Sequence, residues 1–163
     1  MPPAADDCPS CHELAEIEAG RDPLAVARLG AGYVRLNHCQ HYVGSTFYVA
    51  TTCVAEVHQL DPSERATHLM EMAAVSGAVH DEFGARKMNV ESLGNGVPHL
   101  HWWLTPRPHD DRRPGGPIWE DLDFLRDLWT GAARPAPDVA DQLRRRLLAA
   151  LVRHDLPIEA TFI

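Results

Sequence analysis

The sequence lacks any apolar run long enough to cross a membrane, since a spanning helix needs about 20 such residues in succession. The opening residues, MPPAADD, are acidic and have no apolar segment, so we expect no signal peptide there. Lysine is nearly absent, with Lys87 as its single example, and the formal net charge is −8. A chain of this charge lacks the basic face typical of proteins that bind nucleic-acid polymers. We therefore expect a cytoplasmic protein that binds neither a membrane nor a nucleic-acid polymer.

Two common phosphate-binding motifs are also missing. The sequence contains neither a P-loop nor a Gly-x-Gly-x-x-Gly turn, so any phosphate group must be bound by other means. No internal repeat occurs, and a chain of 163 residues is expected to form a single domain over 1–163. In a reducing compartment, its four cysteines are expected to be metal ligands or buried thiols rather than disulfides.

The spacing of apolar residues predicts an α+β fold. Four segments are expected to form strands of an antiparallel sheet, because they are rich in β-branched and aromatic residues: 32–37, 45–51, 86–94 and 98–107. The turn sequence LGNG separates the last two and predicts a hairpin-like connection. Long parallel crossovers are missing, which argues against a doubly wound fold.

The clearest predicted helix follows Asp61. Asp61 is a suitable cap, Pro62 suits the first helical position, and Gly84 ends the pattern. Its expected buried stripe comprises Leu69, Met72, Val75, Val79 and Phe83. A short helix after CPSC and helices over 119–129 and 137–155 are also expected. We assign 8–120 to the core of the domain and 121–163 to a C-terminal helical extension.

The segment VPHLHWWLTPR, residues 97–107, contains two histidines separated by one residue. Side chains alternate between the faces of a strand, so His99, His101 and Trp103 are expected on one face, with Leu100 and Trp102 on the other. Two adjacent imidazoles can supply a nucleophile and a neighbour, or a metal ligand and a nucleophile. They can also be hydrogen-bonded residues without chemistry, and the spacing alone leaves these alternatives open.

The longer stretch LGNGVPHLHWWLTPR resembles the histidine-triad (HIT) family, whose signature is His-φ-His-φ-His-φ-φ with φ apolar. It is most similar to the bacterial, zinc-containing subgroup that resembles diadenosine polyphosphate hydrolases. KMN (87–89), TTCVAEVHQL, CPSC and PGGPIW occur in comparable order in that family. The resemblance implies a HIT-like fold with an antiparallel sheet of about five strands packed against helices. It also implies a homodimer.

The resemblance further implies nucleotide hydrolysis or nucleotidyl transfer at an α-phosphate of a purine nucleotide. His101 corresponds to the middle histidine, which attacks phosphorus and becomes transiently nucleotidylated. A neutral imidazole is a good nucleophile near neutral pH. Asn95, with the backbone of Gly96 and Val97, is expected near the phosphate, and Asn89 is expected to contact the ribose or phosphate.

Trp103 stands where the family has its third histidine. An indole donates one hydrogen bond but cannot relay a proton. The change is consistent with a slower hydrolase, with an altered substrate that contacts Trp103, or with a protein that binds nucleotide or a partner without turnover. A more remote alternative is a zinc-dependent structural module in which both histidines hold only metal or core.

Cys8 and Cys11 form a Cys-x-x-Cys pair, a spacing that lets two thiolates bind one tetrahedral ion. The resemblance extends this pair to a structural zinc held by Cys8, Cys11, Cys53 and His99. Cys39 or His41, in NHCQH, is an alternative to one of these ligands.

Overall fold

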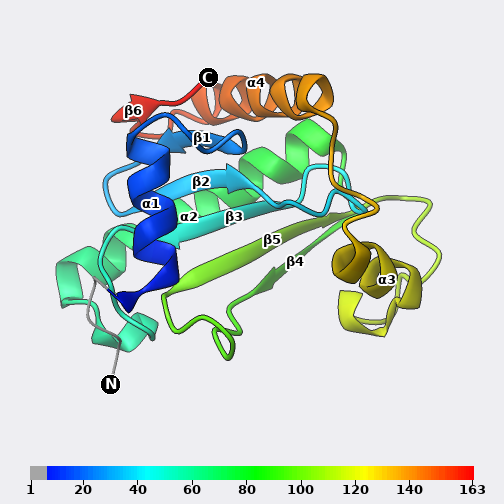
Figure 1. The fold of residues 1–163 in the computed structure, drawn as a ribbon, viewed down its shortest axis with the longest axis horizontal. Coiled ribbons are helices and arrows are strands. Elements are labelled where there is room, and N and C mark those ends of the chain that lie inside the picture. Colours follow the sequence, from blue (N-terminus) through cyan, green and yellow to red (C-terminus); the bar gives the residue numbers. More distant parts are fainter. Residues whose placement is uncertain (1–6) are drawn as a thin grey trace.

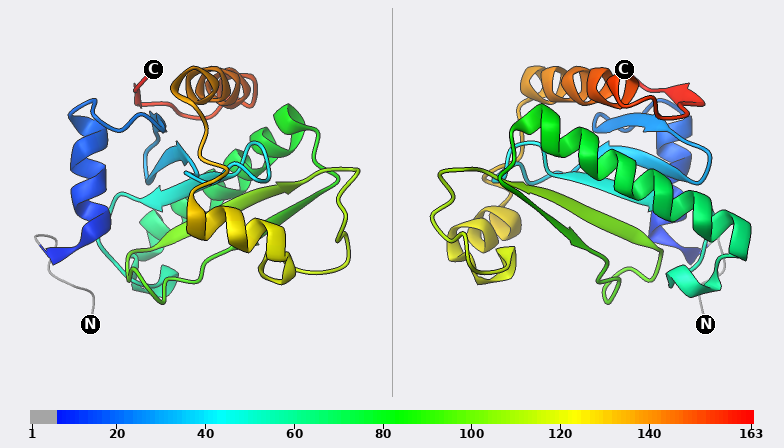
Figure 2. Two further views of the ribbon diagram at one scale, coloured as in Figure 1. Left: turned by 45° about the vertical axis from the view of Figure 1, so that its right-hand side comes forward. Right: turned by 180° about the vertical axis from the view of Figure 1, so that it is seen from behind.

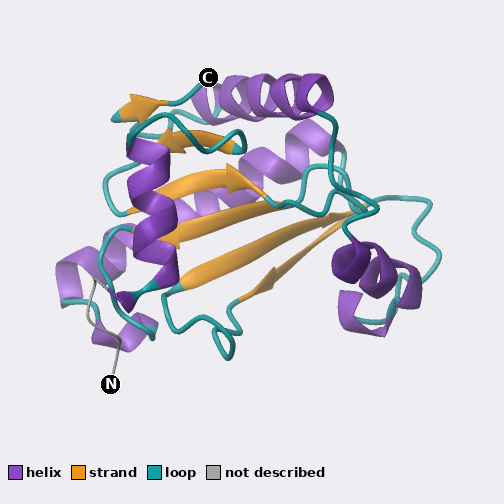
Figure 3. Ribbon diagram, in the orientation of Figure 1, coloured by secondary structure: helices purple, strands orange, loops and turns teal. Residues whose placement is uncertain are grey.

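One antiparallel sheet of six strands, in the order β4-β5-β3-β2-β1-β6, forms the centre of the structure (Figures 1 and 3). The structure is a computed structural model and describes residues 7–163; the start of MPPAADD, for which we expect no signal peptide, lies outside the described residues. The strands are β1 (Ala25–Arg28), β2 (Gly32–Leu36), β3 (Thr46–Ala50), β4 (Lys87–Glu91), β5 (His101–Arg107) and β6 (Ala160–Thr161).

The helices are α1 (Pro9–Glu18), α2 (Pro62–Phe83), α3 (Leu122–Thr130) and α4 (Pro137–Arg153), with short 3-10 helices η2 (Val57–Gln59) and η3 (Ile118–Glu120). This arrangement confirms the predicted α+β fold with an antiparallel sheet backed by helices. The sheet has six strands rather than about five, because β1 and β6 are short and lack a clear alternating pattern in the sequence. None of the helices in the described chain is both long and apolar enough to cross a membrane.

Helix α2 begins and ends where its signals predict. The Asp61 side chain accepts hydrogen bonds from the backbone N–H groups of Ser63 and Glu64, and Gly84 ends the helix in a left-handed conformation with φ of 61°. The predicted buried stripe is partly wrong. Val75 and Val79 are buried, but Leu69 is 36% exposed.

The buried face of α2 instead includes two polar residues, His68 and Glu71. The Glu71 carboxylate accepts hydrogen bonds from the backbone of Gly30 and Ala31 and from the Tyr48 hydroxyl. A buried carboxylate is tolerated when its oxygens are hydrogen-bonded in this way. The buried face of the helix is therefore set partly by the hydrogen bonds of Glu71, which the spacing of apolar residues does not reveal.

Helices α2 and α4 cover one face of the sheet, which Figure 2 shows from behind. Val75 and Val79 of α2 pack with Leu147 and Leu151 of α4 in the largest buried cluster. Strand β6 pairs with β1 at the sheet edge. The C-terminal segment thus contributes directly to the main hydrophobic core.

Helices α1 and α3 lie on the opposite face (Figure 1). Leu14 and Ile17 of α1 pack on Phe47 and Val49 of β3. Near α3, Phe124 packs in a cluster that includes Trp103 of β5. This face carries the residues that the sequence singles out for chemistry.

Candidate functional site

Strand β5 separates its side chains as the alternation predicts. Trp102 and Leu104 contact the core beneath α2, whereas Trp103 contacts the clusters under α1 and α3. The strand itself begins at His101, so His99 lies just before it and is fully buried. The two histidines are therefore in different environments, one inside the protein and one at the surface of a pocket.

His101 is held in a defined tautomer. Its Nδ1 lies 2.7 Å from the backbone carbonyl oxygen of His99. A carbonyl only accepts hydrogen bonds, so Nδ1 carries the proton and Nε2 of the neutral ring keeps its lone pair. The Phe47 ring meets the His101 ring edge to face at 6.1 Å and limits its rotation.

The His101 pocket is a cavity of about 220 Å³ between α1 and the sheet. Of the residues predicted to act on substrate, it brings together His101, Val97 and Trp103. Its full lining is Pro9, Ser10, Glu13, Arg35, His38, Phe47, Val49, Val97, His101 and Trp103.

The other predicted substrate contacts lie elsewhere. Asn95 and Gly96 are exposed in the loop before β5 and do not line the pocket. Asn89 pairs with Thr105 across the sheet, and its side-chain oxygen accepts a 2.7 Å hydrogen bond from Arg107 Nη1. Asn89 is thus engaged with Arg107, two residues beyond its partner on β5.

Arg107 has a structural role. Its side chain is 3% exposed and forms an ion pair of 2.6 Å with Asp111. Its guanidinium also donates to the backbone carbonyls of Arg113 and Gly116. Arg107 therefore fixes the loop after β5 and has no free donor for a ligand.

Sequence reasoning missed five polar or aromatic residues that line the pocket: Ser10, Glu13, Arg35, His38 and Phe47. A signal for two of them was present. Arg35 pairs with Phe47, and Phe47 pairs with Trp103, in one row across β2, β3 and β5. Alternation along the three strands predicts this shared face once their pairing is known.

Trp103 forms a fixed wall of the pocket. Its ring meets Phe47 at 4.7 Å and Trp119 at 5.4 Å, both edge to face. Trp119 is anchored by a 3.0 Å hydrogen bond from its Nε1 to Glu91. The indole of Trp103 thus joins the pocket to the segment that carries α3.

The four predicted metal ligands converge. One ligand atom from each of Cys8, Cys11, Cys53 and His99 lies within 4.8 Å of the others. His99 Nδ1 is 3.4 Å from Cys8 Sγ and 3.7 Å from Cys11 Sγ. Tetrahedral zinc, with bonds of roughly 2.0–2.3 Å, places its ligands roughly 3.3–3.8 Å apart. The donor set therefore fits a zinc ion.

The protonation of His99 also fits a metal ligand. Its Nε2 donates to the Ala50 carbonyl oxygen at 2.9 Å, which leaves the Nδ1 lone pair directed at the sulfurs. Burial lowers the pKa of His99, so the ring is neutral as a ligand must be. Burial, followed by the neighbouring thiols of Cys53 and Cys8, raises the pKa of Cys11 to about 12. A bound cation would stabilise the thiolates and so offset the cost of ionising neighbouring thiols in a partly buried site.

The alternative ligands are excluded by their positions. Cys39 is buried in a cluster with Tyr42 and Phe124. His41 Nδ1 lies 2.7 Å from Asp127, on α3. Neither belongs to the Cys8–Cys11–Cys53–His99 cluster.

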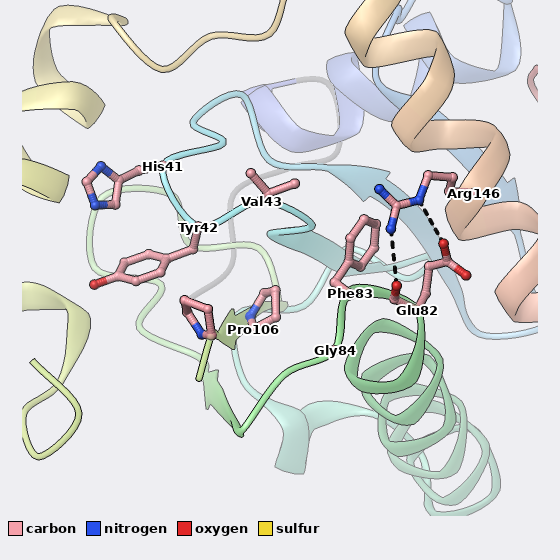
Figure 4. A pocket seen from close by; sticks show the side chains of 9 residues that line it. His41, Tyr42, Val43, Glu82, Phe83, Gly84, Pro106 and Arg146 are labelled. Atoms are coloured by element: carbon pink, nitrogen blue, oxygen red, sulfur yellow. Dashed lines mark hydrogen bonds and ion pairs between the residues drawn. The ribbon is translucent and has the colours of Figure 1, made fainter. Parts of the chain in front are cut away.

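A separate cavity of about 530 Å³ lies at the far end of β5, beside Pro106 (Figure 4). Its charged groups are already paired, because Arg146 of α4 binds both the side chain and the backbone carbonyl of Glu82 at the end of α2. Of the residues that the sequence singles out as catalytic, substrate-binding or metal-binding, it contains only His41, the alternative metal ligand that lies apart from the Cys8–Cys11–Cys53–His99 cluster.

The structure is similar to solved histidine-triad proteins. A histidine triad protein from Sinorhizobium meliloti is 24% identical, with a TM-score of 0.62 over 84% of this chain and 94% of that one. A Zn-bound histidine triad family protein from Mycobacterium smegmatis is 18% identical, with a TM-score of 0.64 over 93% and 98%. A hypothetical histidine triad nucleotide-binding protein from Sulfolobus tokodaii is 13% identical, with a TM-score of 0.66 over 88% and 93%. The chain has the histidine-triad fold.

No protein-family model and no curated protein matches the sequence. The likeness is therefore one of fold, covering more than nine-tenths of each of these three structures. It agrees with the fold that the segment LGNGVPHLHWWLTPR predicts. One of the similar structures is a zinc-bound protein, and the cluster of Cys8, Cys11, Cys53 and His99 in this chain is compatible with zinc.

Proposed function

We propose that this protein is a nucleotide hydrolase or nucleotidyltransferase in which His101 attacks the α-phosphate of a purine nucleotide. The observation that supports this most is the His101 ring, whose Nδ1 donates to the His99 carbonyl while the ring lines the pocket. That hydrogen bond leaves Nε2 as the nucleophilic atom. The fold of histidine-triad proteins supports the same class of activity.

The reaction has two steps. Nε2 of His101 forms a bond to phosphorus as the bond between phosphorus and the leaving group breaks, giving a nucleotidyl-histidine. The imidazole gains positive charge, which the His99 carbonyl stabilises through the hydrogen bond of 2.7 Å. Water, or another acceptor, then forms a bond to phosphorus as the bond between phosphorus and Nε2 breaks; the nucleotide is released, the proton of the acceptor passes to solvent, and the imidazole is neutral again. Val97 and Trp103 border the reacting group, and Gly96 and Asn95 lie on the loop beside it.

The leaving group follows from Trp103. An indole N–H donates a hydrogen bond but does not transfer a proton. A polyphosphate leaves as an anion and needs no proton, whereas an amine leaving group must be protonated. A dinucleoside polyphosphate is therefore favoured over a nucleoside phosphoramidate as substrate. This agrees with the subgroup that the sequence resembles, although the assignment to that subgroup is itself part of the proposal.

Zinc is proposed to be structural. Four protein ligands, from Cys8, Cys11, Cys53 and His99, would complete its coordination and leave no open position. The ion would fix the start of α1 and the carbonyl of His99, to which His101 is hydrogen-bonded. We further propose that Asn89 acts through Arg107 on the end of β5. We also propose that the protein is cytoplasmic, as its sequence predicts, and a homodimer, as the resemblance implies.

The test compares wild-type protein with His101→Ala on diadenosine tetraphosphate and on adenosine phosphoramidate, with His80→Ala as the control for an exposed histidine of α2. We expect turnover of the polyphosphate to exceed that of the phosphoramidate, to disappear in His101→Ala and to persist in His80→Ala. Turnover that survives in His101→Ala contradicts the proposal.

A second candidate is a protein that binds nucleotide or a partner without turnover. Trp103 packs against Phe47 and Trp119, so the position of the third histidine is filled by an indole. This favours the second candidate, because an indole does not transfer a proton to a leaving group. Calorimetry that detects binding of adenosine monophosphate to a wild-type protein without hydrolytic activity, together with turnover in Trp103→His, would support this alternative.

A further inference from the structure

The His101 pocket has a polar end that the proposed reaction does not use. Ser10 and Glu13 reach it from α1, Arg35 from β2, and His38 from the loop that follows β2. Glu13, Arg35 and His38 also line an adjoining hollow of about 470 Å³. The space therefore continues beyond the reacting group, along the side of α1.

Arg35 is paired with an acidic residue at this end. Its Nε donates to Asp22 at 2.9 Å, and both side chains are mostly buried, with exposures of 14% and 8%. Arg35 is the one basic residue among those that line the His101 pocket. Arg134 is exposed and lines only the adjoining hollow. The polar end thus holds the Arg35–Asp22 ion pair and the carboxylate of Glu13.

The remaining polar groups have unused capacity to accept hydrogen bonds. The carboxylate of Glu13 forms no hydrogen bond or ion pair with any residue of the described chain, and the same holds for the hydroxyl of Ser10. Ser10 is only 8% exposed. Burial, and then the charges of Arg35 and Arg134, lower the pKa of His38 and keep its ring neutral. Glu13 and Ser10 thus present hydrogen-bond acceptors to the pocket, and a ligand that supplies donors would pair with them.

We infer that Glu13 and Ser10, with His38 beside them, bind two neighbouring hydrogen-bond donors on the nucleoside part of the substrate. This inference rests on the proposed function for the identity of the ligand. It orients the substrate, with the nucleoside against α1, the α-phosphate at His101 and the leaving group toward Trp103. Two parts of a nucleoside offer such donors: the vicinal hydroxyls of ribose, and the imino and amino edge of guanine.

The test measures binding by calorimetry for wild type and Glu13→Gln. Glu16→Gln is the matched control, since Glu16 lies on the same helix, is exposed and pairs with Arg21. The ligands are guanosine monophosphate, inosine monophosphate, which lacks the amino group, and 2′-deoxyguanosine monophosphate. Because a hydrogen bond to a charged group is lost, Glu13→Gln is expected to weaken the binding of guanosine monophosphate by about 10-fold or more. Glu16→Gln is expected to bind as wild type does.

The source of the donors follows from the other ligands. If guanine supplies them, inosine monophosphate binds wild type about 10-fold more weakly than guanosine monophosphate and is little affected by Glu13→Gln. If ribose supplies them, 2′-deoxyguanosine monophosphate instead binds wild type about 10-fold more weakly than guanosine monophosphate and is little affected by Glu13→Gln. Glu13 is exposed and has no hydrogen-bond or ion-pair partner among residues 7–163, so the variant is expected to fold.

Two results overturn the inference: unchanged affinity in Glu13→Gln, or an equal loss for all three ligands. These outcomes are separable from failure of the proposed function, because binding does not require turnover. Turnover that depends on His101, without any effect of Glu13→Gln on binding, refutes this inference alone. Selective loss of binding in Glu13→Gln, in a protein without turnover, supports this inference while refuting the proposed reaction.

Discussion

Replacing Trp103 by histidine puts a histidine where the resemblance implies the third one of the motif, and it is expected to destabilise the protein. The indole forms edge-to-face pairs with Phe47 at 4.7 Å and with Trp119 at 5.4 Å. Each such pair contributes about 0.5–1.5 kcal/mol beyond the burial of its area. Loss of both pairs therefore lowers the free energy of unfolding by about 1–3 kcal/mol.

Urea unfolding followed by far-ultraviolet circular dichroism measures this loss without relying on tryptophan fluorescence. Trp129→His is the matched control, because Trp129 is 82% exposed on α3. A substitution at so exposed a site is expected to change stability by no more than about 0.5 kcal/mol. For activity, Trp103→His is expected to increase turnover of adenosine phosphoramidate by roughly 10²–10³, the usual value of one well-placed donor in a transition state.

Two results would refute this reasoning. Equal stability of Trp103→His and wild type would mean that the indole does not hold Phe47 and Trp119 in place. Unchanged turnover of the phosphoramidate, in a variant that remains folded, would mean that the missing histidine does not limit departure of the leaving group.

Three further outcomes are expected. The purified protein contains one zinc per chain; Cys53→Ala loses most of it, and Cys39→Ala retains it, as elemental analysis can show. Burial lowers the pKa of His68, so below about pH 6.5 the unfolded chain binds more protons at this residue than the folded chain does. The free energy of unfolding therefore falls with decreasing pH, by at most about 1.4 kcal/mol per pH unit from this residue. Unfolding of His68→Gln measured between pH 7 and 5 should show a smaller slope, and an equal slope would contradict this assignment. Arg107→Lys leaves buried hydrogen-bond acceptors unpaired and should cost about 3–5 kcal/mol, and a loss below about 1 kcal/mol in urea unfolding would argue against its structural role.

Much of the fold follows from local signals in the sequence. The helix between Asp61 and Gly84 could be predicted because its cap, first proline and terminating glycine act within one turn of the chain. The buried face of that helix could not, because it depends partly on Glu71 meeting the backbone of Gly30 and Ala31, about 40 residues away. Strand β6 was missed for a related reason, since two residues carry no periodicity.

The candidate site divides in the same way. His101 and the ligands Cys8, Cys11, Cys53 and His99 could be predicted because their residue types and order match a known motif. The polar end of the pocket could not, because Glu13 and His38 meet only when α1 packs across β2 and β3. The alternation that places His101 and Trp103 on one face of β5 cannot show which helix covers that face.

The central claim is tested most directly by trapping the covalent intermediate. Protein mixed with diadenosine tetraphosphate is quenched within milliseconds in alkaline denaturant, because a phosphoramidate is labile in acid, and its intact mass is measured. We expect a fraction of the chains to gain the mass of one adenylyl group, located on the peptide that contains His101 and absent from His101→Ala. Rapid turnover with no such adduct, or an adduct on any other residue, would contradict the account.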